Sequence, residues 1–200
     1  MFVKVCGLST PESVRTAVES GADAVGFVLT RSPREVTPAQ ARNLLACVPA
    51  GLPAVGVFRH ETAADAVAVA READLAWVQL HGDRSPADVR TVHDAGMKVI
   101  RAVTMSAAPE AFEDWGEELL LIDAAVPGSG EAWDYSSVRA LGLEGRRWLL
   151  AGGLDPANVA RAAAEAGAWG MDVSSGVESS RGVKDLAKIR EFVKAAKSSD

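Results

Sequence analysis

The chain has 200 residues, 48% of them hydrophobic, and a formal net charge of −6. This length and apolar content suit a single domain with a substantial core. The acidic balance argues against a nucleic-acid-binding surface, and no apolar run is long enough to span a membrane. We therefore expect a globular protein that binds neither nucleic acid nor membranes.

Cysteine usage and the first residues indicate the compartment. Met1 leads straight into an apolar run, so we expect no signal segment before the fold. Only Cys6 and Cys47 are present, and their spacing matches neither a zinc site nor a disulfide framework. These features predict a reduced, cytoplasmic setting. Cys47 follows Leu44 and Leu45 in a predicted helix, where we expect a plain core residue.

Short β-rich runs alternate with helical segments, and the predicted strand ends are about 21–29 residues apart, which indicates one repeated strand–helix unit. Eight such units without a reversal point predict a single (β/α)₈ TIM barrel over residues 1–200. An open doubly wound sheet is the alternative. The predicted strands are Phe2–Cys6, Ala24–Leu29, Ala54–Phe58, Ala76–Leu80, Lys98–Ala102, Leu119–Asp123, Trp148–Ala151 and Gly170–Val173.

Helix boundaries carry their own signals. A capping side chain followed by proline predicts helix starts, and glycine in a left-handed conformation predicts helix ends. The fifth helix is the weakest, because the segment 108–116 is short and its pattern is poor. A last helix, Lys184–Lys197, presents one apolar face to the barrel. The starts are Thr10-Pro11, Thr37-Pro38, Ser85-Pro86 and Asp155-Pro156, and the ends are Gly21, Gly96 and Gly167.

Two glycine-bearing loops follow neighbouring strands near the end of the chain. Gly152-Gly153 follows one strand, and Ser174-Ser175-Gly176 follows the next. In a (β/α)₈ barrel, the loops after strands seven and eight commonly bind phosphate through backbone N–H groups. One glycine pair alone could make only a tight turn, but two such loops together predict a phosphate site.

Reactive residues stand at the carboxyl ends of strands, where barrel enzymes hold their chemistry. Cys6 ends the first strand beside a glycine, although a buried thiol without function is the alternative. Asp123 ends an apolar strand, where a carboxylate is costly unless it is used or paired in a structural salt bridge. His81 is either an orienting residue or a hydrogen-bonded core histidine, and Asp172 lies on the eighth strand.

Several motifs together resemble the phosphoribosylanthranilate isomerase family, in order from residue 3 to about 195. The resemblance implies a (β/α)₈ barrel of tryptophan biosynthesis without a cofactor or metal. The implied reaction is an Amadori rearrangement of N-(5-phosphoribosyl)anthranilate to 1-(2-carboxyphenylamino)-1-deoxyribulose 5-phosphate. The motifs are Lys4-Val5-Cys6-Gly7, residues 21–27, Ser32-Pro33-Arg34, Val55-Gly56-Val57-Phe58, Gln79-Leu80-His81-Gly82, Asp123, residues 149–159, Asp172–Glu178 and Lys184-Asp185.

The resemblance implies residue roles as well. Cys6 would be the general base, Asp123 the general acid, and Arg34 the residue that holds the anthranilate carboxylate. Arg31 and Arg59 are alternatives to Arg34. We also expect substrate contacts from His81 and Asp172. The expected phosphate-binding residues are Gly128, Ser129, Gly130, Gly152, Gly153, Ser174, Ser175 and Gly176.

Three positions depart from the family pattern. Pro127 stands in a loop that usually begins with two glycines, and a proline lacks the N–H that a phosphate would use. His60 stands where an asparagine is frequent, and Glu35 follows Arg34 where a ring residue is common. These departures leave open whether the loop after Asp123 binds the phosphate and how side chains pack around the anthranilate.

Two other functions compete with this interpretation. The sister isomerase of histidine biosynthesis performs the same rearrangement on a larger substrate. A resemblance to that family would imply an aspartate at the end of the first strand, where this chain has Cys6. A non-catalytic phosphate-binding barrel would need neither Cys6 nor Asp123. We therefore expect an enzyme that acts on a small phosphorylated substrate, as a monomer or a dimer.

Overall fold

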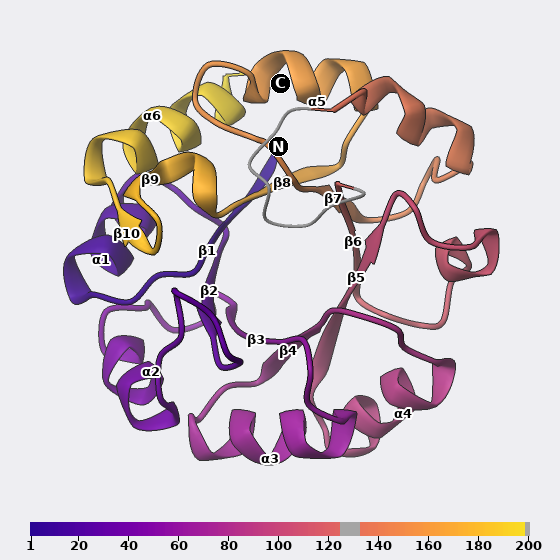
Figure 1. Cartoon of the computed structure of the whole chain (residues 1–200). Coiled ribbons are helices and arrows are strands. Elements are labelled where there is room, and N and C mark those ends of the chain that lie inside the picture. The colour runs from indigo at the N-terminus through magenta and orange to yellow at the C-terminus, as the bar shows by residue number, and fades with distance from the viewer. Residues whose placement is uncertain (125–132, 199–200) are drawn as a thin grey trace.

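The computed structural model describes residues 1–124 and 133–198, which form a closed barrel of eight parallel strands (Figure 1). Each strand pairs with the next, and β1 pairs with β8 to close the ring. Closure confirms the predicted (β/α)₈ barrel and excludes the open sheet. The strands are β1 (Phe2–Cys6), β2 (Ala24–Val28), β3 (Ala54–Phe58), β4 (Trp77–Leu80), β5 (Lys98–Thr104), β6 (Leu119–Asp123), β7 (Trp148–Leu150) and β8 (Gly170–Val173).

Helices form the outer ring (Figure 1). In the described ranges, none of them is long and apolar enough to cross a membrane. A small antiparallel pair, β9 (Glu178–Ser180) and β10 (Val183–Lys184), follows β8. The α-helices are α1 (Pro11–Glu19), α2 (Pro38–Leu45), α3 (Ala63–Glu72), α4 (Pro86–Asp94), α5 (Val159–Ala166) and α6 (Leu186–Lys197), and the 3₁₀ segments are η1 (Pro109–Phe112), η2 (Tyr135–Leu141) and η3 (Ser175–Val177).

Most of the predicted helix starts are confirmed: α1, α2 and α4 begin where a capping side chain is followed by proline. Thr10 and Thr37 each accept a hydrogen bond from the backbone N–H three residues on, and Pro follows each of them in the first turn. At the start of α4, the backbone N–H and the hydroxyl of Ser85 both donate to the carboxylate of Asp88. Gly167 ends α5 in a left-handed conformation, as predicted. Side chains that satisfy the unpaired N–H groups of the first turn thus fix these boundaries.

Three predictions about the helices are wrong, whereas four strand ends differ from the predicted ones by only one or two residues. Asp155 does not cap α5: its carboxylate accepts from the N–H groups of Ala157 and Asn158, which closes a separate turn, and α5 begins at Val159. Cys47 lies beyond the end of α2 at Leu45 and is half-buried. The last helix begins at Leu186, because Lys184 belongs to β10 and Asp185 caps the helix.

The weak fifth helix is replaced by a charged cluster. Only η1 forms there, and Arg101 of β5 points outward beneath it, fully buried. Arg101 donates to the backbone carbonyl of Ala111, pairs with Glu117 at 2.7 Å and stacks over the Trp115 ring at 3.9 Å. Charge-assisted hydrogen bonds therefore hold a segment that has no regular helix to anchor it.

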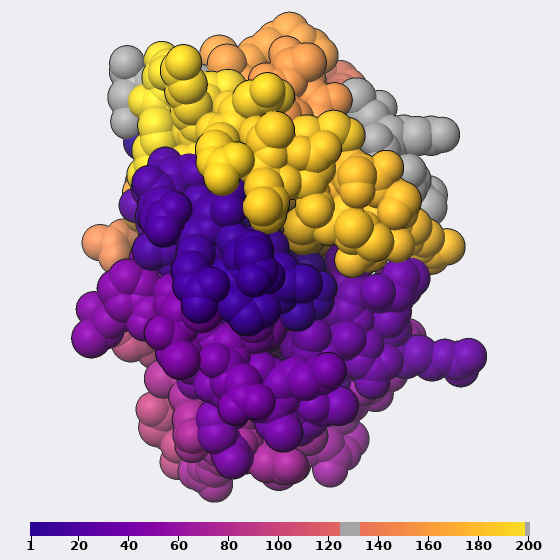
Figure 2. All heavy atoms as spheres, turned by 90° about the vertical axis from the view of Figure 1, so that its left-hand side faces the viewer, coloured from indigo at the N-terminus to yellow at the C-terminus, as the bar shows by residue number. Residues whose placement is uncertain are grey.

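The first and last helices complete the outer layer. Figure 2 shows the N-terminal segment directly beside the C-terminal helix. Lys197 of α6 donates to Asp23 at 2.5 Å, and the same carboxylate accepts from the Val3 N–H at 2.7 Å. The end of the chain is therefore tied to the first strand.

Strand alternation divides the core into two layers. Val3 and Val5 of β1 point outward into the large cluster shared with the helices, whereas Lys4 and Cys6 point into the barrel. The lower interior is apolar, with Leu121 among its residues. Polar groups enter toward the carboxyl ends of the strands, which is where the functional site lies.

Candidate active site

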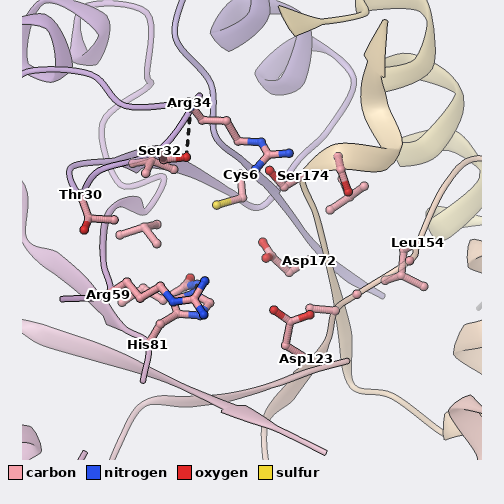
Figure 3. Close-up of a pocket in the computed structure, with 18 of the residues that line it drawn as sticks. Cys6, Thr30, Ser32, Arg34, Arg59, His81, Asp123, Leu154, Asp172 and Ser174 are labelled. Carbon is pink, nitrogen blue, oxygen red and sulfur yellow. Dashed lines mark hydrogen bonds between the residues drawn. The ribbon is translucent and has the colours of Figure 1, made fainter. Parts of the chain in front are cut away.

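A pocket opens at the carboxyl ends of the strands, as expected for barrel enzymes. Figure 3 shows that the predicted residues converge there from separate elements. They come from β1, β6, β8 and the loops after β2, β4 and β8. The lining includes Cys6, Arg34, His81, Asp123, Asp172 and Ser174.

Cys6 is the last residue of β1 and is only 6% exposed. Burial raises the pKa of its thiol, because a thiolate loses solvation. The positive charges of Lys4 and Lys184 oppose this increase in the pKa, whereas the carboxylate of Asp172 adds to it. The thiol is therefore placed among charges of both signs.

Asp123 ends β6 and faces the same pocket. Burial raises its pKa to about 6, and the negative charge of Asp172 adds to the increase. Its Oδ1 accepts from the N–H of Ala124 at 2.8 Å, which leaves Oδ2 for a ligand. A carboxyl group with this pKa is partly protonated near neutral pH, as a general acid requires.

Asp172 forms a buried ion pair across the β1–β8 seam. Its Oδ1 lies 2.8 Å from Nζ of Lys4, its register partner on β1. Lys4 is fully buried. Burial alone would lower the pKa of this ammonium, but the charge of Asp172 and the neighbouring Cys6 thiol raise it overall, so Lys4 remains protonated.

Arg34 is held in place before any ligand arrives. Its Nε lies 2.6 Å from Glu178 Oε1, and its Nη2 donates to Oε2 at 3.1 Å. Glu178 also accepts from Lys184 and from the Gly182 N–H, and these contacts lower its pKa to about 2 despite its burial. Because Glu178 occupies one edge of the guanidinium, the edge formed by Nη1 and Nη2 remains for a second carboxylate.

Gly7 lets these groups approach the end of β1. Its φ of +75° suits glycine, and a Cβ there would lie 2.7 Å from Arg34 Cδ and 3.1 Å from Ser174 Oγ. Gly152, with φ +82°, makes similar room for Asp123, whose Oδ1 would lie 2.7 Å from an added Cβ. Both glycines are therefore required by close packing at the site.

The two glycine-bearing loops lie together, as predicted. A Cβ on Gly176 would overlap the carbonyl of Leu154, so the loop after β8 is packed against the loop after β7. The Gly152 and Gly153 carbonyls accept hydrogen bonds from the hydroxyl of Tyr135 behind the loop. Among the described residues, the N–H groups of Gly153, Ser175 and Gly176 donate to no acceptor. These free donors suit an anion.

The remaining predicted phosphate residues, Gly128, Ser129 and Gly130, lie outside the described residues, as does Pro127. Within residues 1–124 and 133–198, no group of three or more His, Cys, Asp or Glu side chains is placed to hold a metal ion.

His81 lines the pocket but is not a cation. Burial lowers its pKa to about 3, and the positive charges of Lys4, Arg59 and Arg84 act in the same direction. Gln79 donates its amide N–H to Nε2 of the neutral ring, across 2.6 Å. His81 is therefore positioned as an uncharged hydrogen-bonding group beside the pocket.

Sequence reasoning missed three charged members of the site: Lys4, Glu178 and Lys184. Lys4 had a signal, because a lysine two residues before Cys6 in an apolar strand must share its inward face. Glu178 pairs with both Lys184 and Arg34, and the second pair forms only when the segment after β8 packs against the loop after β2. The spacing of these residues in the chain carries no sign of that pairing.

The fold and the pocket define a class: a (β/α)₈ barrel enzyme with a thiol and a carboxyl group that face one pocket at the carboxyl ends of the strands. Residues 3–195 match the family model of N-(5′-phosphoribosyl)anthranilate (PRA) isomerase. The chain belongs to this family, whose members are isomerases of tryptophan biosynthesis.

Relatives and solved structures agree with this assignment. N-(5′-phosphoribosyl)anthranilate isomerase of Trichlorobacter lovleyi is 40% identical, and the match covers 98% of this chain and 97% of that one. Phosphoribosyl anthranilate isomerase of Thermus thermophilus superposes with a TM-score of 0.90 at 35% identity, covering 99% of both chains. TrpF of Jonesia denitrificans has a TM-score of 0.87 at 43% identity, covering 100% of this chain and 98% of that one.

Asp123→Asn should reveal what the buried carboxyl costs in stability. The pKa of Asp123 rises from its ordinary 3.8 to about 6 in the folded protein, so the folded state binds more protons between these values. Stability therefore falls as pH rises through this window, and the loss is complete above it. We expect the variant to be more stable than the unmodified protein by about 1–3 kcal/mol at about pH 8, but not at about pH 3.

Urea unfolding at the two pH values measures this difference. Asp83→Asn, at an exposed position, is the control and is measured at the same two pH values. An equal effect of Asp123→Asn at both pH values would contradict the proposed origin of the raised pKa.

Proposed function

We propose that Cys6 and Asp123 are the general base and general acid of the rearrangement of N-(5-phosphoribosyl)anthranilate. The observation that carries this proposal is their meeting in one pocket from β1 and β6. Asp123 delivers a proton to the ribose ring oxygen, the ring opens, and an iminium forms at C1. The Cys6 thiolate then removes the proton from C2, which the iminium has made acidic.

The pKa of Asp123 suits its proposed step. A group with a pKa of about 6 holds its proton in a useful fraction of molecules near neutral pH and still gives it up readily. Its Oδ1 is committed to the backbone of the next residue, so Oδ2 is the oxygen that faces the substrate. Asp172 interacts electrostatically with both Asp123 and Cys6, and we assign it to a sugar hydroxyl between them.

The two anionic ends of the substrate match two separate parts of the mouth. Phosphate fits the N–H groups of the loops after β7 and β8, and the anthranilate carboxylate fits the free edge of Arg34. A relative that is 35% identical has been solved with reduced 1-(o-carboxyphenylamino)-1-deoxyribulose 5-phosphate, which carries both groups.

We also propose that the protein works in the cytoplasm as a monomer. The reduced cysteines and the small-molecule substrate support this location. A related isomerase of Thermotoga maritima is described as dimeric, so a dimer is the alternative state that sedimentation would identify.

The direct test of the activity is the fluorescence of freshly made phosphoribosylanthranilate, which should decay when the protein is added. In this assay, we expect Cys6→Ala and Asp123→Asn each to lower kcat by roughly 10²–10⁴, the size of one proton-transfer role. Cys47→Ala is the matched control and should retain full activity, because Cys47 lies outside the pocket. Near-normal turnover by Asp123→Asn would assign the acid elsewhere.

Arg34→Ala should raise KM strongly. The loss of the paired contact with the substrate carboxylate is expected to cost about 1.5–3 kcal/mol. Arg34→Lys should recover only part of this, because an ammonium cannot hold Glu178 and the substrate carboxylate by paired bonds at once. Steady-state kinetics of Arg31→Ala and Arg59→Ala provide the comparison. If either of these fails while Arg34→Ala behaves normally, the carboxylate contact belongs to that residue.

Phosphate should bind the loops after β7 and β8 before any other place. We expect sulfate or phosphate in crystals beside Gly153 and Ser175, and competitive inhibition by inorganic phosphate. Gly176→Ala should weaken this inhibition, because the added methyl group forces Leu154 and its loop away. Anion density at the opposite end of the barrel, with these loops empty, would refute the assignment.

A further inference from the structure

Lys4 lies beneath the pocket and is not among the residues that line it. It is fully buried, and its Nζ is 2.8 Å from Asp172 Oδ1. Lys4 and Cys6 are two residues apart on β1, so their side chains share the inward face of the barrel. A buried ammonium is costly to desolvate, even when it is paired. The position of Lys4 next to the proposed base therefore indicates a functional role.

The Lys4 ammonium and the Cys6 sulfur lie over the same glycine. Gly26 of β2 is the register partner of Cys6. A Cβ added to Gly26 would lie 2.9 Å from Cys6 Sγ and 3.3 Å from Lys4 Nζ. The missing side chain therefore leaves the space in which the sulfur and the ammonium come together.

The charges that face Cys6 leave one positive charge in excess. Lys4 faces it from β1, Asp172 from β8, and Lys184 from β10. Arg34 lies against the adjoining Gly7, and Glu178 pairs with both Arg34 and Lys184. Three cationic side chains thus share two carboxylates. A thiolate at Cys6 would balance the cluster.

We propose that Lys4 is a positioning residue of the isomerisation, whose buried ammonium, held by Asp172, stabilises the thiolate form of Cys6. The inference rests on the proposed role of Cys6 as the general base. The thiol first loses its proton to water; the thiolate then accepts the proton from C2 of the substrate and becomes a thiol again. Lys4 keeps its three protons throughout.

The electrostatics of the cluster agree with this role. Burial raises the pKa of the Cys6 thiol, and Lys4 is the largest influence in the opposite direction. Loss of the Lys4 charge should therefore raise the pKa further, whereas loss of the Asp172 charge should lower it. A general loss of stability in the two variants would not change the pKa of the thiol in opposite directions.

The test is the titration of Cys6 in the substrate-free protein, followed by the ultraviolet absorbance of the thiolate in a Cys47→Ser background. Lys4→Met should raise the midpoint by about one pH unit or more, and Asp172→Asn should lower it. The kcat/KM of Lys4→Met should be reduced about tenfold or more near neutral pH and recover as pH rises. Lys194→Met, at an exposed position on α6, should change neither.

Lys4→Met leaves Asp172 buried without its partner and risks unfolding. In that case the double variant Lys4→Met/Asp172→Asn, which leaves no unpaired buried charge, is compared with Asp172→Asn: a higher midpoint in the double variant supports the proposal, and an equal or lower one overturns it. If Lys4→Met folds, an unchanged midpoint overturns it as well. Full activity of Cys6→Ala would instead refute the role of Cys6 as base, and the titration would still measure the coupling between Lys4 and the thiol.

Discussion

The pairing of β1 with β8 is the contact on which both the fold and the site depend. It joins the first strand to the last, and its register places Lys4 opposite Asp172, residues that are 168 positions apart in the chain. Without this seam the sheet would stay open, and Lys4 and Cys6 would lose Asp172 as a neighbour. Barrel closure and the assembly of the site are therefore one event, and the ion pair at the seam costs desolvation that apolar packing elsewhere must offset.

Burial at the barrel mouth helps the proposed acid but hinders the proposed base. It raises the pKa of both Asp123 and Cys6, because both lose solvation in their charged forms. For an acid that must carry a proton at neutral pH this increase is useful, whereas for a base that must lose one it is harmful. Neighbouring charges adjust the two pKa values differently. The carboxylate of Asp172 raises the pKa of Asp123 further, whereas the ammonium of Lys4 opposes the increase in the pKa of Cys6. One ion pair thus acts on both groups: Asp172 raises the pKa of Asp123, and at Cys6 the influence of Lys4 exceeds that of Asp172.

The sequence predicted what depends on local pattern. The β/α alternation gave the eight strands, Thr10 and Thr37 capped the expected helices, and the strand-end rule placed Cys6 and Asp123 in one pocket. The errors lie where side chains compete locally or where contacts are distant. Asp155 resembles a helix cap, but Asn158 bonds back to Asp155 and to Gly153, so a turn forms first. The ion pair of Glu178 with Arg34 joins the segment after β8 to the loop after β2, and Lys184 joins the cluster only through Glu178, so no spacing in the chain predicts these contacts.

The substrate itself would change the charge balance of the mouth. Its phosphate and carboxylate bring negative charge to a cluster in which three cations share two carboxylates. That charge would favour binding, but it would also oppose a thiolate at Cys6. The iminium formed after ring opening is positive and lies next to C2, so it restores the field that favours a thiolate when the base acts. In the proposed mechanism, the electrostatics of the pocket therefore favour the same order as the chemistry of the sugar, with the acid acting first and the base second.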